Sequence, residues 1–152
     1  RRRKGPSPGA ARNNKIVELG RKGKWKEMLL IHAKEKEGFN NVNYSTTMSQ
    51  LGRIRFVDHR DPLVRAFLDD LGYQVEVQGL RWLQVQHVAN IMHAIAKMNL
   101  RNERTSRILF SQVEEHAEKL VKAGKPQDIS NTVWACATTK RGTCPHSVCN
   151  LL

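Results

Sequence analysis

The sequence predicts an all-α fold: a helical-hairpin repeat solenoid of about three units, with a disordered basic N-terminal tail. The main observation is a recurring segment, because residues 86–98 and 127–139 carry Gln, Asn and two Ala at matched positions, 41 residues apart (Asn90 to Asn131). A weaker copy at 43–54 aligns with the first of these at an offset of 44 residues (Met48 to Met92). A period of about 40 residues with helical spacing inside each copy is typical of helical-repeat arrays.

Residues 1–14 differ in composition from the rest of the chain. Gly, Pro and Ser are interspersed with five Lys or Arg residues, and no apolar periodicity is present. Such segments bury too little apolar surface to fold. We therefore expect a disordered basic tail. It is either a solvated linker or processing remnant, or a segment that attracts nucleic-acid phosphates independently of base sequence.

Residues 15–152 are expected to form an α-helical repeat domain. Its units are predicted at about 15–56, 57–100 and 101–152, the last one truncated. In each unit, amphipathic segments are separated by Gly, Pro or Asn, which end helices and form turns. Each unit is therefore interpreted as a helical hairpin.

The first unit shows one clear helical stripe. Apolar residues with the spacing i, i+3, i+4 and i+7 predict a helix that follows Gly23 and ends at Gly38. A second helix is expected over 44–54, on the apolar side chains of Met48 and Leu51. The stripe of the first helix consists of Trp25, Met28, Leu29 and His32.

The second unit contains the helix that defines the repeat. Asp61 and Pro62 are suited to the N-cap and first position of a helix, which Gly72 is expected to end. Residues 73–83 are interpreted as a loop inserted between helices, and a second helix is predicted over 85–100. Its expected core residues are Val88, Ile91, Met92, Ile95 and Met98.

The third unit is predicted to begin with a long helix over 103–123, capped by Gly124. Pro126 then opens the next helix, in which Trp134 is expected to be buried. Residues 145–152 would begin a further helix. The chain begins at Arg1 rather than Met, and we expect a fragment or a processed form.

Positive charge is the most unusual property of the composition. The chain has 26 Lys and Arg against 14 Asp and Glu, a net charge of +12 and a pI of about 10.1. Residues 1–26 contain ten of the basic residues and one acidic residue, Glu18. Such a balance favours a polyanionic partner, usually nucleic acid, with a membrane surface as the competing target. No window approaches the roughly 20 apolar residues of a membrane helix, so no membrane-spanning segment is expected.

The sequence offers little for catalysis. Six scattered His form no recognisable signature with a carboxylate, and neither a phosphate loop nor a paired-acid nuclease motif is present. Cys144, His146 and Cys149, with Cys136 or His116 as the fourth ligand, are the nearest approach to a zinc site, but they lack its usual paired spacing. We therefore expect no enzyme, no metal and no cofactor. Three Cys outside any disulfide framework agree with a reducing compartment.

Basic residues recur where the second helix of each unit ends. A positive charge at the same point of three stacked units would form a stripe suited to the phosphates of a single strand. The alternative is that these cations stabilise helix C-termini, where the dipole is negative. The candidates are Arg53, Arg55, Lys97, Arg101, Lys140 and Arg141.

Two further residue types leave alternatives open. Asn is a mediocre helix former, so its recurrence at Asn90 and Asn131 indicates either a structural hydrogen bond or direct contact with a base. Trp25 and Trp134 lie on apolar stripes and are expected in the core, and they could stack on bases only if exposed. Trp82 is expected to be partly exposed.

The recurring segment resembles the octotricopeptide repeats, whose motif runs approximately PQELANTLWALATLG. Residues 80–98 (LRWLQVQHVANIMHAIAKM) and 125–138 (KPQDISNTVWACAT) carry the resemblance. The last copy matches at Pro126, Gln127, Asn131, Trp134, Ala135 and Ala137. The middle copy matches at Gln86, Ala89, Asn90, Ala94 and Ala96, and it has His93 in place of the Trp. The same pattern occurs in FAST-kinase-like proteins with a terminal RAP domain.

The first unit is also similar to a pentatricopeptide repeat, through residues 20–29 (GRKGKWKEML) and 42–53 (VNYSTTMSQLGR). Both resemblances imply a helix-pair array that binds single-stranded RNA. The first implies a chloroplast or mitochondrial protein that acts in RNA processing, stability or translation by occupying a transcript. The alternatives are a protein–protein interaction scaffold, or a spacer array for a missing C-terminal RAP or catalytic domain.

Overall fold

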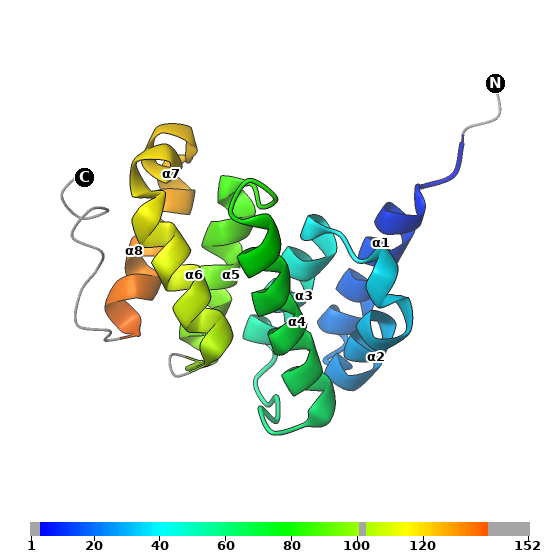
Figure 1. Ribbon diagram of the computed structural model, residues 1–152. Coiled ribbons are helices and arrows are strands. Elements are labelled where there is room, and N and C mark those ends of the chain that lie inside the picture. Colours follow the sequence, from blue (N-terminus) through cyan, green and yellow to red (C-terminus); the bar gives the residue numbers. More distant parts are fainter. Residues whose placement is uncertain (1–3, 101–102, 140–152) are drawn as a thin grey trace.

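The computed structural model describes residues 4–100 and 103–139 (Figure 1). All regular structure in these ranges is helical, so the predicted all-α class is confirmed. The elements are α1 (Pro8–Arg21), α2 (Trp25–Glu35), a 3-10 turn (Lys36–Gly38), α3 (Asn41–Arg53), α4 (Pro62–Gln78), α5 (Val85–Lys97), α6 (Arg104–Glu115), α7 (Ala117–Ala123) and α8 (Pro126–Thr138).

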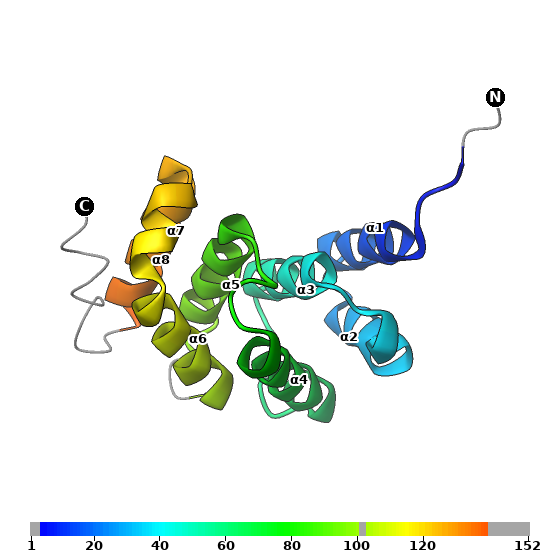
Figure 2. The same ribbon diagram turned by 45° about the horizontal axis from the view of Figure 1, so that its top comes forward.

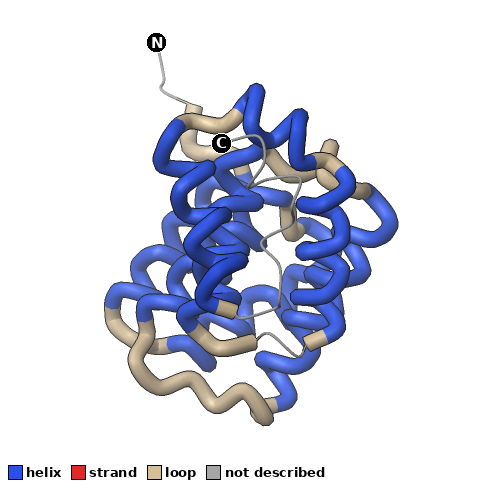
Figure 3. The backbone as a smooth tube through the Cα atoms, turned by 90° about the vertical axis from the view of Figure 1, so that its left-hand side faces the viewer, coloured by secondary structure: helices blue, strands red, loops and turns tan. Residues whose placement is uncertain are grey.

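The helices form two layers. In the first layer α1 packs on α3, α3 on α5, and α5 on α8; in the second layer α2 packs on α4, and α4 on α6 (Figures 1 and 2). Figure 3 shows the array from the end at which α8 lies, with the layers on either side. The three copies of the recurring segment fall on α3, α5 and α8, so they all belong to the first layer.

Small residues let the helices of each layer approach closely. A Cβ atom added at Gly52 of α3 would lie 3.1 Å from the Cα and Cβ atoms of Ala94 in α5. A Cβ atom at Gly72 of α4 would lie 2.8 Å from the Thr105 hydroxyl in α6, which donates a 2.5 Å hydrogen bond to the Leu68 carbonyl. The predicted core face of the 85–100 helix is confirmed, since all five of its residues are buried.

The N-terminal tail is shorter than predicted, because α1 begins at Pro8. The prediction of disorder over 1–14 is therefore wrong for residues 8–14. The Ser7 hydroxyl caps the helix by accepting a hydrogen bond from the Ala10 N–H at 3.3 Å, and Pro8 occupies its first turn. Ile16 and Leu19 bury the other end of the helix in the core.

Arg12 explains why this basic segment folds. Its side chain is 9% exposed, and its guanidinium donates to the Gly38 carbonyl at 2.7 Å and to Asn43 Oδ1 at 3.2 Å. It also forms a 3.3 Å ion pair with Glu35. A charge that the sequence pattern assigned to a solvated tail therefore joins α1 to the end of α2 and the start of α3.

Two helix boundaries also differ from the predictions. Helix α4 runs through Gly72 to Gln78, where the sequence indicated a loop, because Val75 continues its buried face. The helix ends at Gly79, whose φ of 67° suits glycine. The long helix expected over 103–123 is interrupted at His116, which separates α6 from α7.

A buried polar cluster connects the layers. Asp70 of α4 has a side chain that is 2% exposed, and its Oδ2 atom accepts hydrogen bonds from His32 Nε2 of α2, at 2.7 Å, and from the Tyr44 hydroxyl of α3. Lys36 Nζ lies 3.5 Å from Oδ1, the oxygen that has no hydrogen-bond partner among the described residues. Edge-on contacts of the His32 ring with Phe39 and Phe67 enclose this cluster.

The cluster favours an ionised Asp70. Burial raises the pKa of this carboxyl, but the hydrogen bonds from Tyr44 and His32 and the charge of Lys36 outweigh it and lower the pKa below its ordinary value of 3.8. Burial, with the adjacent carboxylate, raises the pKa of the Tyr44 hydroxyl well above its usual range. The Tyr44 hydroxyl therefore keeps its proton, and donates it to Asp70 in a hydrogen bond, throughout the pH range in which proteins are normally folded.

Deletion of residues 1–14 is expected to destabilise the protein, whereas deletion of residues 1–5 should not. The longer deletion removes Arg12, whose hydrogen bonds to charged and carbonyl groups are each worth about 1.5–3 kcal/mol. In a chain of this size such a loss lowers the melting temperature by several degrees. Thermal unfolding followed by circular dichroism measures both deletions, and equal melting temperatures would contradict the role of Arg12.

Substitution of Asp70 by Asn should cost about 3 kcal/mol of stability near neutral pH, because it removes one partner of a buried ion cluster. Since the folded pKa of Asp70 is lowered, its contribution is present above the unfolded pKa and is lost as pH falls through the folded value. The gap between wild type and Asp70→Asn should therefore shrink below about pH 4.

Urea unfolding over a pH series checks this expectation. Tyr44→Phe, which keeps the carboxylate but removes one donor, is the matched control and should retain an acid-sensitive stability. A stability gap for Asp70→Asn that stays constant down to acidic pH would show that the carboxylate is not held ionised.

Candidate functional site

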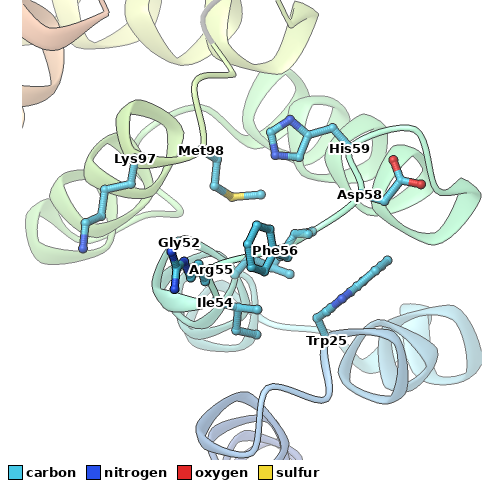
Figure 4. A pocket seen from close by; sticks show the side chains of 11 residues that line it. Trp25, Gly52, Ile54, Arg55, Phe56, Asp58, His59, Lys97 and Met98 are labelled. Atoms are coloured by element: carbon cyan, nitrogen blue, oxygen red, sulfur yellow. The ribbon is translucent and has the colours of Figure 1, made fainter.

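Two adjoining cavities lie where helices α3 and α5 end. The larger, which we call the terminal pocket, has a volume of about 530 Å³ and lies between the ends of α3 and α5, the 54–59 segment and Trp25 (Figure 4). The smaller, which we call the layer groove, has a volume of about 170 Å³ and is lined by α3, α5 and α8. Gly52 and Lys97 line both cavities, so the two cavities are neighbours on the surface.

Three of the predicted basic residues meet at this site. Arg53 is the last residue of α3, Lys97 is the last residue of α5, and both line the layer groove. Arg55 follows α3 and lines the terminal pocket. The other three candidates, Arg101, Lys140 and Arg141, lie outside the described residues.

The three cations are available to a ligand. All are exposed, and none takes part in the ion pairs formed within residues 4–100 and 103–139. Arg53 and Lys97 also stabilise the C-termini of their own helices. Arg55 lies beyond the end of α3, so stabilisation of the helix dipole does not explain why a cation stands at this position.

Trp134 is exposed, contrary to the expectation that it packs in the core. It is 44% exposed, and its ring lies against the His93 ring with the centroids 4.8 Å apart and the planes at 38°. The two residues occupy matched positions of the recurring segment, on α5 and α8. His93 lines the layer groove, and the Trp134 ring packs on it instead of entering the core, so the apolar stripe alone misplaced Trp134.

The groove is electropositive at His93. Burial, together with the nearby charges of Lys97 and Arg53, lowers the pKa of His93 from its usual 6.5. The imidazole is therefore mostly neutral at physiological pH. The two cations lie close enough to act on one side chain, although they come from different helices.

The recurring Asn residues both line the layer groove. Asn131 Oδ1 accepts a 2.8 Å hydrogen bond from Gln127 Nε2, one turn earlier in α8. This is a bond along the helix rather than across a helix pair. Asn90 lies on α5 in the same groove as Arg53 and Lys97, so both amides border the charged surface.

Phe56 is the residue that the sequence analysis missed. It is 78% exposed in the segment after α3, and the Arg55 guanidinium lies 5.4 Å from its ring centroid. The pattern of Arg53, Arg55 and Phe56, with basic residues next to an aromatic one, was the available signal. Trp25 is half-buried at the opposite wall of the terminal pocket, and Trp82 is half-buried as expected.

The described residues contain no group of three or more His, Cys, Asp or Glu side chains placed to hold a metal ion, and Cys144, His146 and Cys149 lie outside them. Burial raises the pKa of the Cys136 thiol to about 11, which makes it a poor nucleophile. Within the same residues, no helix combines the length and apolar character that crossing a bilayer requires.

Comparisons with models of protein families, with curated proteins and with solved structures find no match to this chain.

Replacement of either cation by alanine should raise the pKa of His93 toward 6.5, because each one disfavours the imidazolium. Arg53→Ala and Lys97→Ala are measured by NMR titration of the His93 ring, with Lys34→Ala on the exposed face of α2 as a charge-matched control. An unchanged pKa in both groove variants would contradict the convergence of the two charges.

Proposed function

We propose that this protein binds single-stranded RNA along the layer groove and the adjoining terminal pocket. On this proposal it is an organellar protein, in a chloroplast or mitochondrion, that acts in RNA processing, stability or translation by occupying a transcript. The resemblance of α5 and α8 to octotricopeptide repeats motivates the organelle and the process. A solenoid of repeated helical hairpins, continuing the two layers, would supply an extended surface for the strand.

The observation that carries the proposal is the pairing of free cations with exposed aromatic rings. Arg53, Arg55 and Lys97 have no acidic partner among the described residues. Phe56 exposes its ring in the terminal pocket, and the exposed Trp134 ring lies against His93, which lines the layer groove. Single-stranded nucleic acid needs both features, because its phosphates attract cations and its unpaired bases stack on aromatic side chains. Neither feature alone distinguishes RNA from other anions.

The mechanism would be steric. Arg53 and Arg55 can each donate two parallel hydrogen bonds to a phosphate, whereas Lys97 acts as a point charge. A strand held by these contacts would be protected from nucleases and prevented from pairing with itself. No bond in the RNA needs to be made or broken, in agreement with the absence of a catalytic signature in the sequence.

A protein-interaction scaffold is the second candidate, and one observation favours it. Tyr73 and Val77, one turn apart on α4, are 56% and 63% exposed and lie in the second layer, away from the cationic site. Neighbouring exposed apolar side chains often mark protein contacts. This candidate would gain support if the chain fails to bind RNA.

Binding of a labelled single-stranded RNA pool, measured by fluorescence anisotropy at several salt concentrations, tests the proposal. The affinity of a single strand falls with salt by a slope of about −0.7 per phosphate contact in a double-logarithmic plot. Arg53→Ala and Lys97→Ala should each weaken binding and reduce the magnitude of the slope by about 0.7. When residues 1–5 are deleted from the wild type and from each variant, the differences in RNA affinity and in salt slope should remain.

The control is Lys34→Ala, which removes the same charge from the second layer. If it weakens binding as much as the groove variants do, the attraction is general and the proposed surface is wrong. If the full chain does not bind the pool at low salt, RNA binding itself is excluded.

A further inference from the structure

We propose that the terminal pocket holds one nucleotide of the bound strand, with its base stacked on Phe56 and its phosphate between Arg55 and Lys97. This inference rests on the proposed function and deepens it, since it assigns one unit of the RNA to one cavity. The volume of about 530 Å³ lies in the range of small-molecule sites, about 300–1,000 Å³. The layer groove, of about 170 Å³, is below that range.

The arrangement of side chains fits the two halves of a nucleotide. Figure 4 shows Phe56 in the middle of the pocket, with Arg55 and Lys97 to one side and Trp25 to the other. The cationic side suits a phosphate, and the aromatic side suits a base. A ligand with only one of these halves would leave the other part of the pocket unused.

The exposed ring of Phe56 is the strongest indication that the pocket binds a ligand. A large aromatic side chain that is 78% exposed gains little from folding, and Phe56 lines a cavity rather than a flat face. The Arg55 guanidinium lies over its ring, so a base on Phe56 would complete a stack of base, ring and cation. Met98, which is buried, and His59 also line the pocket.

Asp58 is the one acidic residue among the described residues that line the pocket, and it is outnumbered by Arg55 and Lys97. Its Oδ1 atom accepts a 2.9 Å hydrogen bond from the Arg60 N–H, in the turn that leads to α4. Arg55 and Lys97 have no such partner among the described residues, and the balance at the pocket is positive. Stacking does not select a base by hydrogen bonding, so we expect purines to bind better than pyrimidines through their larger rings.

The first experiment uses free ligands and the full chain. AMP, adenosine and ribose phosphate are titrated while the backbone amides are followed by two-dimensional NMR. We expect AMP to shift the amides of residues 54–59. Adenosine and ribose phosphate should each bind at least about five-fold more weakly than AMP, because each lacks one half of the ligand. Equal binding of ribose phosphate and AMP would overturn the assignment of the base to Phe56.

Variants at Phe56 make the test specific. Phe56→Ala should weaken AMP binding about five-fold or more, whereas Phe56→Trp, which keeps an aromatic face, should restore it. Tyr73→Ala removes an exposed aromatic residue from the second layer and is the matched control. Because Phe56 is exposed, its loss should leave the fold intact, and the melting temperature verifies this.

The second experiment places a fluorescent adenine analogue at each position of a uridine-rich RNA. We expect the fluorescence at one position to be quenched on binding and the quenching to be lost in Phe56→Ala. If RNA binds but no position responds to Phe56→Ala, the nucleotide site is wrong and the proposed function stands. If AMP binds at Phe56 but RNA does not bind, the pocket takes a free nucleotide and the proposed function is wrong.

Discussion

The packing of the helices depends on a buried carboxylate, Asp70, that three of them share. Asp70 of α4 accepts hydrogen bonds from His32 of α2 and Tyr44 of α3, and therefore fixes both the spacing within the second layer and the separation of the two layers. A buried charge is tolerated only where hydrogen bonds and counter-charges replace water, which makes the geometry of these helices unusually specific. Aromatic rings around the cluster exclude water and strengthen each of its contacts.

The candidate site lies at the edge of these packed helices, and the close approach of α3 and α5 positions it. Gly52 brings α3 against Ala94 of α5, so the last turns of the two helices end side by side. Arg53 and Lys97 thereby come together although the sequence separates them. The segment after α3 then leads to α4, and its residues Arg55 and Phe56 line the terminal pocket. The site is thus a consequence of close helix packing and of one exposed connection.

The errors of the sequence analysis have a common physical origin. Helical periodicity identifies a buried face, but it cannot say what that face contacts. Trp134 satisfied the apolar pattern of α8 and is nevertheless exposed, because its neighbour is His93 on the groove side. The 8–14 segment looked like a solvated tail, because composition does not reveal that Arg12 reaches the Gly38 carbonyl and Glu35 from a distant part of the chain. Val75 extended α4 past Gly72 for the same reason, since its burial requires a partner helix.

The sequence by itself determined the helical class, the recurring segment that became α3, α5 and α8, and some of the helix ends, such as the N-cap Asp61 and the C-cap Gly124. These are local properties, set by spacing, capping and backbone preference. The tertiary structure decided which of the basic residues share a surface, that Phe56 stands in a cavity, and that His32, Tyr44 and Asp70 meet in the core. Such convergence depends on contacts between residues far apart in the chain, and no local pattern encodes them.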